Sequence, residues 1–305
     1  MKNIIYYITC LLLLTFTEAK SIEPQKLDSL IQVALKGNSN AQVEVVLHYY
    51  NNNKHDECLK WAKLLINNPD EKSRTDKGYA YRCLGLNAYY GKGMSQNKSQ
   101  AIDYLRKSFE CNKHYHAYSA LLIGRILAFD SELQNDNDAI EWFTKAADAS
   151  YAEACGYLAS IYEYGEYTDA AMKQIKKFPN VSKSYTKAAH YHEKYLSGSR
   201  LMSYAPEKDE PARHYKIAEW YYYGKGDLKI DYEKAFTYYK NAIRDMEQPQ
   251  KCLESALLTN EQIANAMWNI SVCYRFGRGT AQNELTAEVW KKKAAKMGHK
   301  KALGQ

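Results

Sequence analysis

The chain of 305 residues contains no apolar run long enough to cross a bilayer. Its longest such run extends from Ile4 to about Phe16, after the positive charge of Lys2 and before the small residue Ala19. This order is typical of a cleavable secretory signal. We therefore expect residues 1–19 to be a signal peptide. The mature chain should be exported, either periplasmic or secreted, without a transmembrane segment.

The short motifs that mark common catalytic sites are also missing. There is no G-x-S-x-G, no C-x-x-C, no H-E-x-x-H and no S-x-x-K with its partner motifs. His114 and His116 form one close pair, and His190 and His192 form another. Two positions apart on a helix, side chains point to different faces, whereas metal-binding pairs use spacings of three or four. We expect no catalytic residue, no cofactor, no metal and no enzyme activity.

Cysteine is too sparse and too irregularly placed to predict a disulfide framework. Cys10 lies inside the apolar run rather than at its end, which argues against a lipoprotein anchor. An even number of cysteines remains after signal removal, but a chain of this length does not need disulfides to fold. We expect at most one or two, and their pairing stays open. The remaining six are Cys58, Cys83, Cys111, Cys155, Cys252 and Cys273.

Negative charge is scarce near the end of the chain, although the formal net charge is only +7. Between positions 261 and 305 there are eight basic residues and three acidic ones. Basic residues in a last helical turn complement the helix dipole, and no aromatic motif of a known nucleic-acid module accompanies them. We expect no nucleic-acid partner.

Tyrosine is abundant instead, with 28 copies against 7 phenylalanines, and it recurs at regular places. Apolar residues recur at intervals of a helix pair, some lengthened by insertions, which indicates a stacked helical array. We call them the anchors: Val45, Leu84, Ile123, Leu158, Ile217 and Ile270. Seven positions later come residues that tolerate a left-handed backbone and predict helix ends: Asn52, Gly91, Asp130, Gly165, Gly224 and Gly277.

Two further columns recur on the helix that follows each of these turns. Small residues occupy the first column, which lets helices approach closely: Cys58, Ala101, Ala139, Ala188, Ala235 and Ala287. Aromatic residues occupy the second, three positions later: Trp61, Tyr104, Trp142, Tyr191, Tyr238 and Trp290. The two columns are one turn apart and share a face, which we expect to be buried between neighbouring helices.

The strings "LGLNAYYGKGMSQNKSQAIDYLRKS" and "IAEWYYYGKGDLKIDYEKAFTYYKNA" resemble Sel-one-like repeats, relatives of tetratricopeptide repeats. Tyr162, Tyr221 and Tyr274 match the tyrosine of that pattern, and the paired glycines of the G-x-G turns match its glycines. The resemblance implies an all-α fold, a right-handed superhelical solenoid of about six helix-turn-helix repeats. A phosphate-binding loop is not expected, because "YYYGKGDLK" lacks the spacing of the Walker motif.

The expected organisation is a signal peptide at 1–19, an N-terminal capping helix within 20–39 and the repeat solenoid over 40–305. Two insertions interrupt the repeats, at about 166–183 and 196–211. Pro179 prevents a continuous helix in the first of these.

The family resemblance also carries the expected function. Its members serve as adaptors in complex assembly, host interaction and envelope maintenance, which implies a scaffold that binds protein partners. Some exported members resemble immunity proteins that sequester a secreted toxin. Some secreted cysteine-rich members are associated with penicillin binding or weak β-lactamase activity, but they carry a regular cysteine pair in each repeat, which is missing here.

Two adjacent columns at the end of the first helix predict where a partner binds. The position six after each anchor is nearly always aromatic, which favours packing. The position five after each anchor changes chemistry from repeat to repeat, which is typical of a surface that recognises a partner, although a tyrosine-rich composition spilling onto the surface explains it equally well. Our candidate partner-binding residues are Tyr89, Tyr222 and Arg275, with Trp220 and Glu163 beside them.

Overall fold

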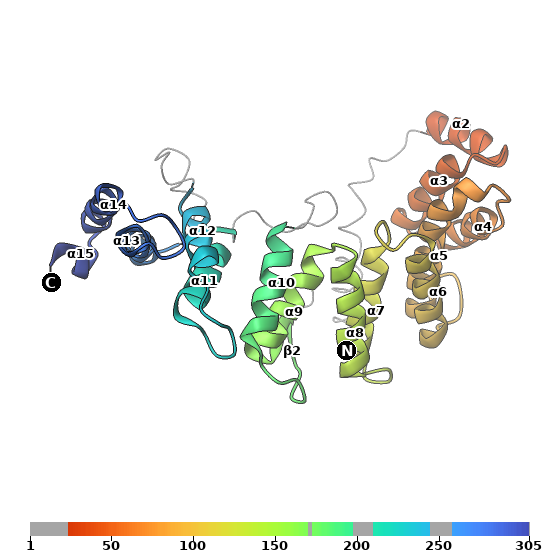
Figure 1. Ribbon diagram of the computed structural model, residues 1–305. Helices are drawn as coiled ribbons and strands as arrows, with labels where there is room; N and C mark the ends of the chain where they lie inside the picture. Colours follow the sequence, from red (N-terminus) through yellow and green to blue (C-terminus); the bar gives the residue numbers. More distant parts are fainter. Residues whose placement is uncertain (1–23, 170–172, 198–209, 245–257, 305) are drawn as a thin grey trace. The chain divides into compact units, whose positions relative to one another are not determined.

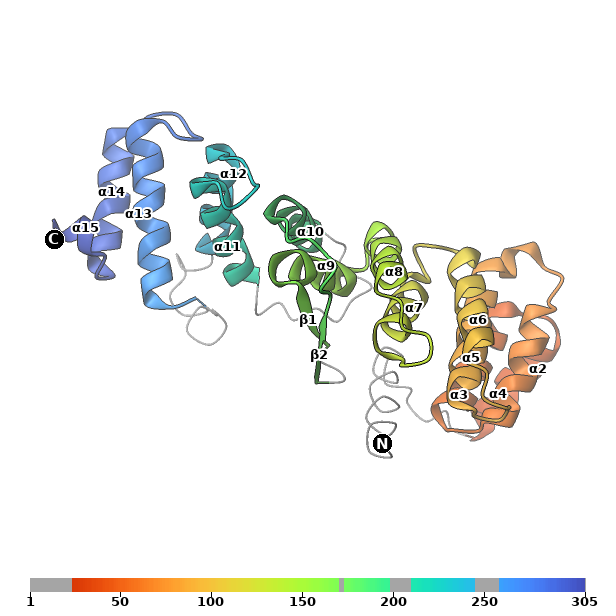
Figure 2. The same ribbon diagram turned by 90° about the horizontal axis from the view of Figure 1, so that it is seen from below.

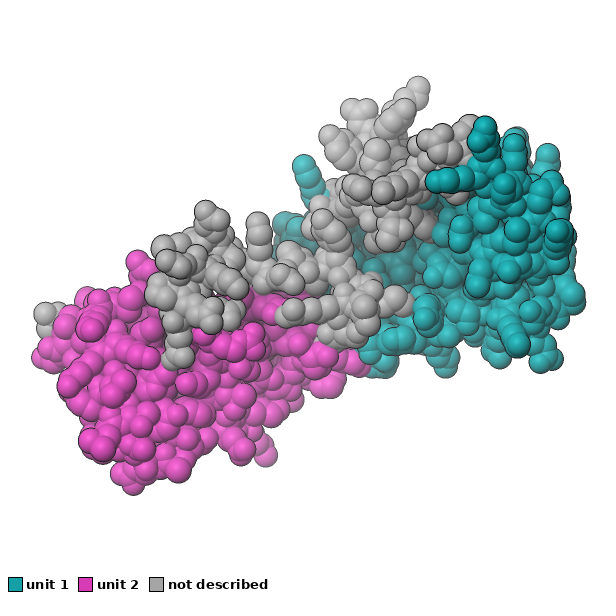
Figure 3. All heavy atoms as spheres, turned by 90° about the horizontal axis from the view of Figure 1, so that it is seen from above, with its two compact units in different colours: residues 1–158, 166–178, 198–204 teal, residues 159–165, 179–197, 205–305 magenta. Residues whose placement is uncertain are grey.

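The computed structural model describes residues 24–169, 173–197, 210–244 and 258–304. The expected signal peptide, Cys10, Cys252 and most of the second insertion lie outside these residues. The chain divides into two compact units (Figure 3). Unit 1 comprises residues 1–158, 166–178 and 198–204, and unit 2 comprises the rest. Each unit is described by itself.

Apart from a short strand hairpin, unit 1 consists of helices joined by short turns (Figure 1). Helix α2 precedes three helix pairs, α3/α4, α5/α6 and α7/α8, and the members of each pair pack on one another. A single turn of 3-10 helix, Glu71–Ser73, leads into α5. The helices are α2 (Pro24–Leu35), α3 (Ser39–Asn51), α4 (His55–Ile66), α5 (Arg74–Tyr90), α6 (Lys98–Cys111), α7 (Ala117–Phe129) and α8 (Asp136–Asp148).

The division between the units falls within α9 (Ala152–Tyr164). Unit 2 continues with α10, the pairs α11/α12 and α13/α14, and a short last helix. These elements are α10 (Tyr185–Ser197), α11 (Glu210–Tyr223), α12 (Tyr232–Ala242), α13 (Asn260–Phe276), α14 (Glu284–Lys296) and α15 (Lys300–Leu303).

The predicted all-α repeat fold is confirmed, and the anchor column lies in its core. Every anchor is at most 4% exposed, and every residue of the small column is completely buried. Burial of side chains such as Ile217 stabilises the fold by about 1.5–3 kcal/mol each. The right-handed path of the superhelix stays a prediction.

All six first helices end at the predicted column, but only the glycines do so in the predicted way. The glycines of that column have φ between 64° and 80°, in the left-handed region. Asn52 and Asp130 have φ of −89° and −77°, so the left-handed expectation is wrong for them. After α3 the positive φ falls one residue later, at Asn53. After α7 the carboxylate of Asp130 accepts hydrogen bonds from the backbone of Glu132 and Leu133 instead.

A capping column at the start of the second helices was not recognised in the sequence. At four of these starts an Asn or Asp side chain accepts a hydrogen bond from the backbone N–H three residues later, which satisfies an otherwise unpaired donor. Its own backbone N–H donates to a carbonyl near the end of the preceding helix, which sets the width of the turn. The residues are Asn97, Asn135, Asp231 and Asn283.

The first insertion contains two short strands that the all-α prediction did not include. β1 (Glu166–Asp169) pairs antiparallel with β2 (Gln174–Lys177) directly after α9 (Figure 2). Tyr167 points inward and contacts Phe143, Tyr157 and Phe178 in unit 1. The hairpin is therefore an addition to the repeat stack, and the Tyr167 ring is one of its attachments.

Candidate interaction surface

The five candidate partner-binding residues are divided between the two units. Tyr89 belongs to unit 1, and the other four belong to unit 2. Trp220, Tyr222 and Glu163 are each 7 or 8% exposed. That burial leaves little of these three side chains for a partner to touch. Their role in binding stays a prediction.

Tyr89 is half-buried at the end of α5. Its hydroxyl donates to Asp130 Oδ2 at 2.9 Å, and Lys98 Nζ lies 3.0 Å from the same carboxylate oxygen. Burial, followed by the hydrogen bond to Asp130, raises the pKa of the Tyr89 hydroxyl. The side chain therefore links the end of α5 to the end of α7 as a neutral donor, and only part of its ring faces solvent.

Glu163 is the centre of a polar network in unit 2. Its carboxylate accepts from Lys216 Nζ at 3.1 Å and lies 3.4 Å from His192 Nε2. Arg213 Nη1 lies 2.5 Å from His192 Nδ1, so the neutral imidazole accepts there and donates to Glu163. Burial by itself raises the pKa of Glu163, but the hydrogen bonds from His192 and Tyr164 and the charge of Lys216 hold it below its usual value.

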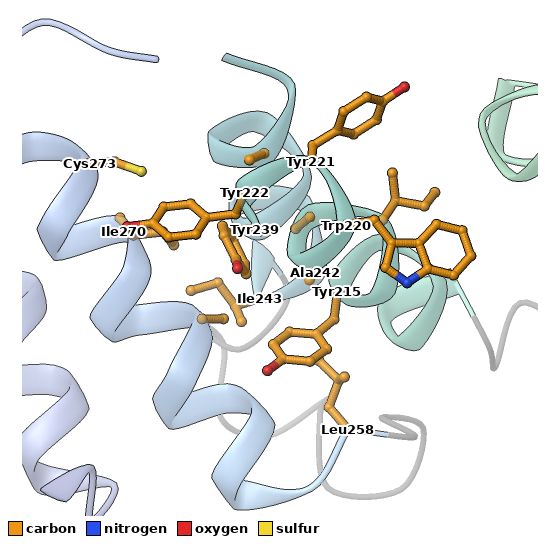
Figure 4. Close-up of a cluster of buried hydrophobic side chains, with 14 of the residues drawn as sticks. Tyr215, Trp220, Tyr221, Tyr222, Tyr239, Ala242, Ile243, Leu258, Ile270 and Cys273 are labelled. Atoms are coloured by element: carbon orange, nitrogen blue, oxygen red, sulfur yellow. The ribbon is translucent and has the colours of Figure 1, made fainter. Parts of the chain in front are cut away.

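Trp220 and Tyr222 leave α11 on opposite sides (Figure 4). The Trp220 ring lies 5.1 Å from the Tyr185 ring and 5.4 Å from that of His192, both on α10. Tyr222 contacts Tyr239 and Tyr232 of α12. These two residues of α11 therefore fill the spaces towards the helices before and after it.

Arg275 is half-exposed on the last turn of α13. It pairs with Glu284 at 3.0 Å and with Glu288 at 3.4 Å, both on α14. These ion pairs connect α13 to α14 on either side of the turn. They also neutralise the charge of Arg275 within the protein. The sequence predicted an accessible arginine at this position but not the two glutamates that form ion pairs with it.

The predicted contrast between the two columns is wrong in unit 2, whereas Tyr90 and Phe129, at position six, are half-buried in unit 1. The aromatic column six after the anchors was expected to pack, but Tyr164, Tyr223 and Phe276 are 52, 61 and 63% exposed. The variable column was expected outside, but Tyr222 and Glu163 are buried. On a helix these columns lie at about 140° and 240° from the anchor, nearly symmetric about it. Side chains at position five point towards the second helix and the following turn, whereas those at position six are exposed to solvent.

The aromatic column of the second helices lies at an edge of the core. Trp142 and Trp290 are buried, whereas the other members are half-buried. Three of these half-buried rings stack on tyrosines of the preceding helix, Tyr104 on Tyr81 with 27° between the ring planes and two others nearly parallel. Tyr191 lies on Tyr162 at 5.8 Å with 4° between the ring planes, and Tyr238 lies on Tyr221 at 6.3 Å with 6°. Tyr162 and Tyr221, two of the three tyrosines shared with the family pattern, are therefore stacking partners within their own repeats, whereas Tyr274 meets Phe236 of the preceding repeat edge to face at 5.2 Å.

The Sel1 repeat model matches this chain over 79–113, 118–151, 152–174, 214–245 and 264–299. These segments cover more than half of the chain, and the protein belongs to the Sel1 repeat family. The first helix pair, α3/α4, lies outside the matches although it carries the same buried columns. Sel1 repeat proteins generally act as scaffolds for protein–protein interaction and are typically non-catalytic.

Two solved structures are similar to this chain at 17% identity. One is a Sel1 repeat protein from Oxalobacter formigenes, with a TM-score of 0.41 and coverage of 86% of this chain and 85% of that one. The other is a protective antigen present in uropathogenic Escherichia coli strains, with a TM-score of 0.36 and coverage of 91% and 65%. None of the curated proteins compared matches this chain.

None of the helices in the described part of the chain is long and apolar enough to cross a membrane. No group of three or more His, Cys, Asp and Glu residues is placed there to hold a metal ion. His116, a member of one sequence pair, is buried with Nε2 2.7 Å from the carbonyl oxygen of Thr75.

Proposed function

We propose that this protein is an exported, non-enzymatic scaffold that binds protein partners outside the cytoplasm. The observation that carries the proposal is the repetition of exposed aromatic side chains in unit 2. Tyr164, Tyr223 and Phe276 are each more than half exposed and stand at the same position of three consecutive first helices. Aromatic residues are enriched among those that dominate binding energy at interfaces.

The surroundings of these rings support binding rather than chemistry. Tyr164 accepts a hydrogen bond from Lys216 Nζ at 3.0 Å, and Lys216 is itself paired with Glu163. Each helix is anchored by a buried residue seven places before its turn, so the rings are presented on a rigid frame. A rigid frame loses little conformational entropy when a partner docks, which favours affinity.

The experiment is a crosslinked pull-down with residues 20–305 as bait, from envelope and secreted fractions. The test bait carries Tyr223→Ala and Phe276→Ala, and the matched control bait carries Leu285→Ala and Val289→Ala, which remove exposed apolar side chains from α14. We expect a prey retained by the wild type and the control but lost with the test bait. Absence of any enriched prey with a folded bait contradicts the scaffold function.

Export requires its own measurement. Expression of the full chain followed by fractionation and N-terminal sequencing should give a mature protein that starts near Lys20 outside the cytoplasm. An uncleaved chain in the cytoplasm contradicts export and leaves the scaffold function standing.

A further inference from the structure

Arg278 lies in the turn between α13 and α14 and is held by three aromatic side chains. Its Nη1 donates to Tyr222 Oη at 3.2 Å. Its guanidinium carbon lies 5.1 Å from the centre of the Tyr232 ring and 5.5 Å from that of Phe276. The cation is therefore fixed in place before any partner arrives.

No carboxylate of the described residues forms an ion pair with Arg278. A guanidinium carries five N–H donors, and Tyr222 accepts from one of them. Arg275, three residues earlier, differs because both Glu284 and Glu288 pair with it. Within one turn the protein neutralises one arginine and leaves the other half-exposed among rings.

The neighbours of Arg278 define what it can bind. Phe276 is 63% exposed and offers apolar surface directly beside the guanidinium. Lys225 occupies the equivalent place in the preceding G-K-G turn, where its Nζ lies 5.6 Å from the centre of the Tyr185 ring. A basic side chain on an aromatic ring thus recurs at consecutive turns of unit 2. Arginine binds a carboxylate through two parallel hydrogen bonds, which gives the site geometric specificity.

We propose that Arg278 and Phe276 form a docking surface for an acidic linear segment of a partner protein. One carboxylate of that segment binds Arg278, and an adjacent apolar side chain covers Phe276. The proposal rests on the scaffold function and names the chemistry of its partner. Charge complementarity favours a single carboxylate over a polyanion, because exposed Asp227, Glu284 and Glu288 border these turns and repel a continuous row of phosphates.

The test measures the fluorescence anisotropy of a fluorescein-labelled peptide that repeats Glu-Phe-Gly-Ser. We expect saturable binding to the wild-type chain, weakened roughly tenfold or more by Arg278→Gln, since hydrogen bonds to a charged group are lost. Arg278→Lys should recover part of the affinity because it keeps the charge without the planar fork. The matched control Lys292→Gln removes one exposed charge from α14 and should change affinity by less than about twofold.

Three results overturn the proposal. They are no saturable binding of the acidic peptide, equal losses with Arg278→Gln and Lys292→Gln, or tighter Arg278-dependent binding of labelled poly-uridine, which assigns the surface to nucleic acid. Circular dichroism of each variant confirms folding. If the pull-down retains an aromatic-dependent prey while the peptide fails to bind, only this inference fails. If no prey is captured, the scaffold function fails as well.

Discussion

Arg125 and Asp169 form a two-point ion pair in the interior of unit 1. Arg125 Nε lies 2.8 Å from Asp169 Oδ2, and Nη2 donates to Oδ1 at 3.1 Å. Asp169 is completely buried, and Arg125 is 9% exposed. The pair joins the inserted strand β1 to α7, across 44 positions of sequence. The hairpin is thus held in the repeat stack by a buried charge as well as by the Tyr167 ring.

Asp169→Ala should lower the free energy of unfolding by about 3–5 kcal/mol, because it leaves the Arg125 guanidinium buried without its counter-ion. Urea denaturation followed by circular dichroism measures the loss. The control is Asp103→Ala, which breaks an exposed pair with Arg106 and should cost less than about 0.5 kcal/mol. Equal losses from the two substitutions would show that the buried pair contributes no more than a surface one. Replacing Arg125 and Asp169 together by leucine should cost less than Asp169→Ala alone.

Gly279→Ala should destabilise the protein by about 3 kcal/mol or more. Gly279 has φ of +70°, and a Cβ there would lie 2.1 Å from the carbonyl oxygen of Tyr232, which is backbone and cannot rotate away. Gly298 has φ of +84° with nothing within 4 Å of the same added atom. Gly298→Ala therefore costs only the left-handed strain, about 1 kcal/mol. Thermal unfolding of both variants separates the steric clash with the Tyr232 carbonyl from the backbone strain of a positive φ. Similar melting temperatures of the two variants would rule out the clash.

Stability should fall as the pH drops from about 6.5 towards 4, partly through His192. Burial lowers the pKa of His192 to about 4, so the native imidazole stays neutral while that of the unfolded chain, with its pKa near 6.5, takes up a proton. His192→Gln should flatten the dependence of melting temperature on pH in this window. An unchanged slope with His192→Gln contradicts the assignment.

The cysteines should behave as five thiols in the described part of the chain. Cys58, Cys83, Cys111 and Cys273 are free cysteines, and of these four only Cys111 is not buried; Cys155 is buried as well. Burial raises the pKa of Cys111, so it should react slowly with Ellman's reagent at neutral pH. In a Cys252→Ser variant of residues 20–305, one thiol should react in the folded protein and five in urea. Fewer than five in urea, without reductant, would reveal a disulfide between these residues.

Much of the repeat was predictable from the sequence, because an anchor such as Ile217 can be recognised from the helical spacing around it and from the turn that follows its helix. The pairing of Arg125 with Asp169 was not, since no periodicity joins an insertion to a helix 44 positions away. The short strands were also missed, although Tyr167 and Thr168 are strand-forming residue types. The choice between the columns at positions five and six failed in unit 2 because both lie at similar angles from the anchor.

Tyr222→Ala and Tyr223→Ala test that choice with the same substitution at adjacent positions of α11. Tyr222 is 8% exposed among Tyr232, Tyr239 and Arg278, so truncating it leaves a cavity and should cost about 3–5 kcal/mol of unfolding free energy. Tyr223 is 61% exposed and should cost less than about 1 kcal/mol. Chemical denaturation gives both values. In the pull-down, Tyr223→Ala should weaken prey capture without unfolding the bait. A larger stability loss for Tyr223→Ala than for Tyr222→Ala would restore the original assignment of the two columns.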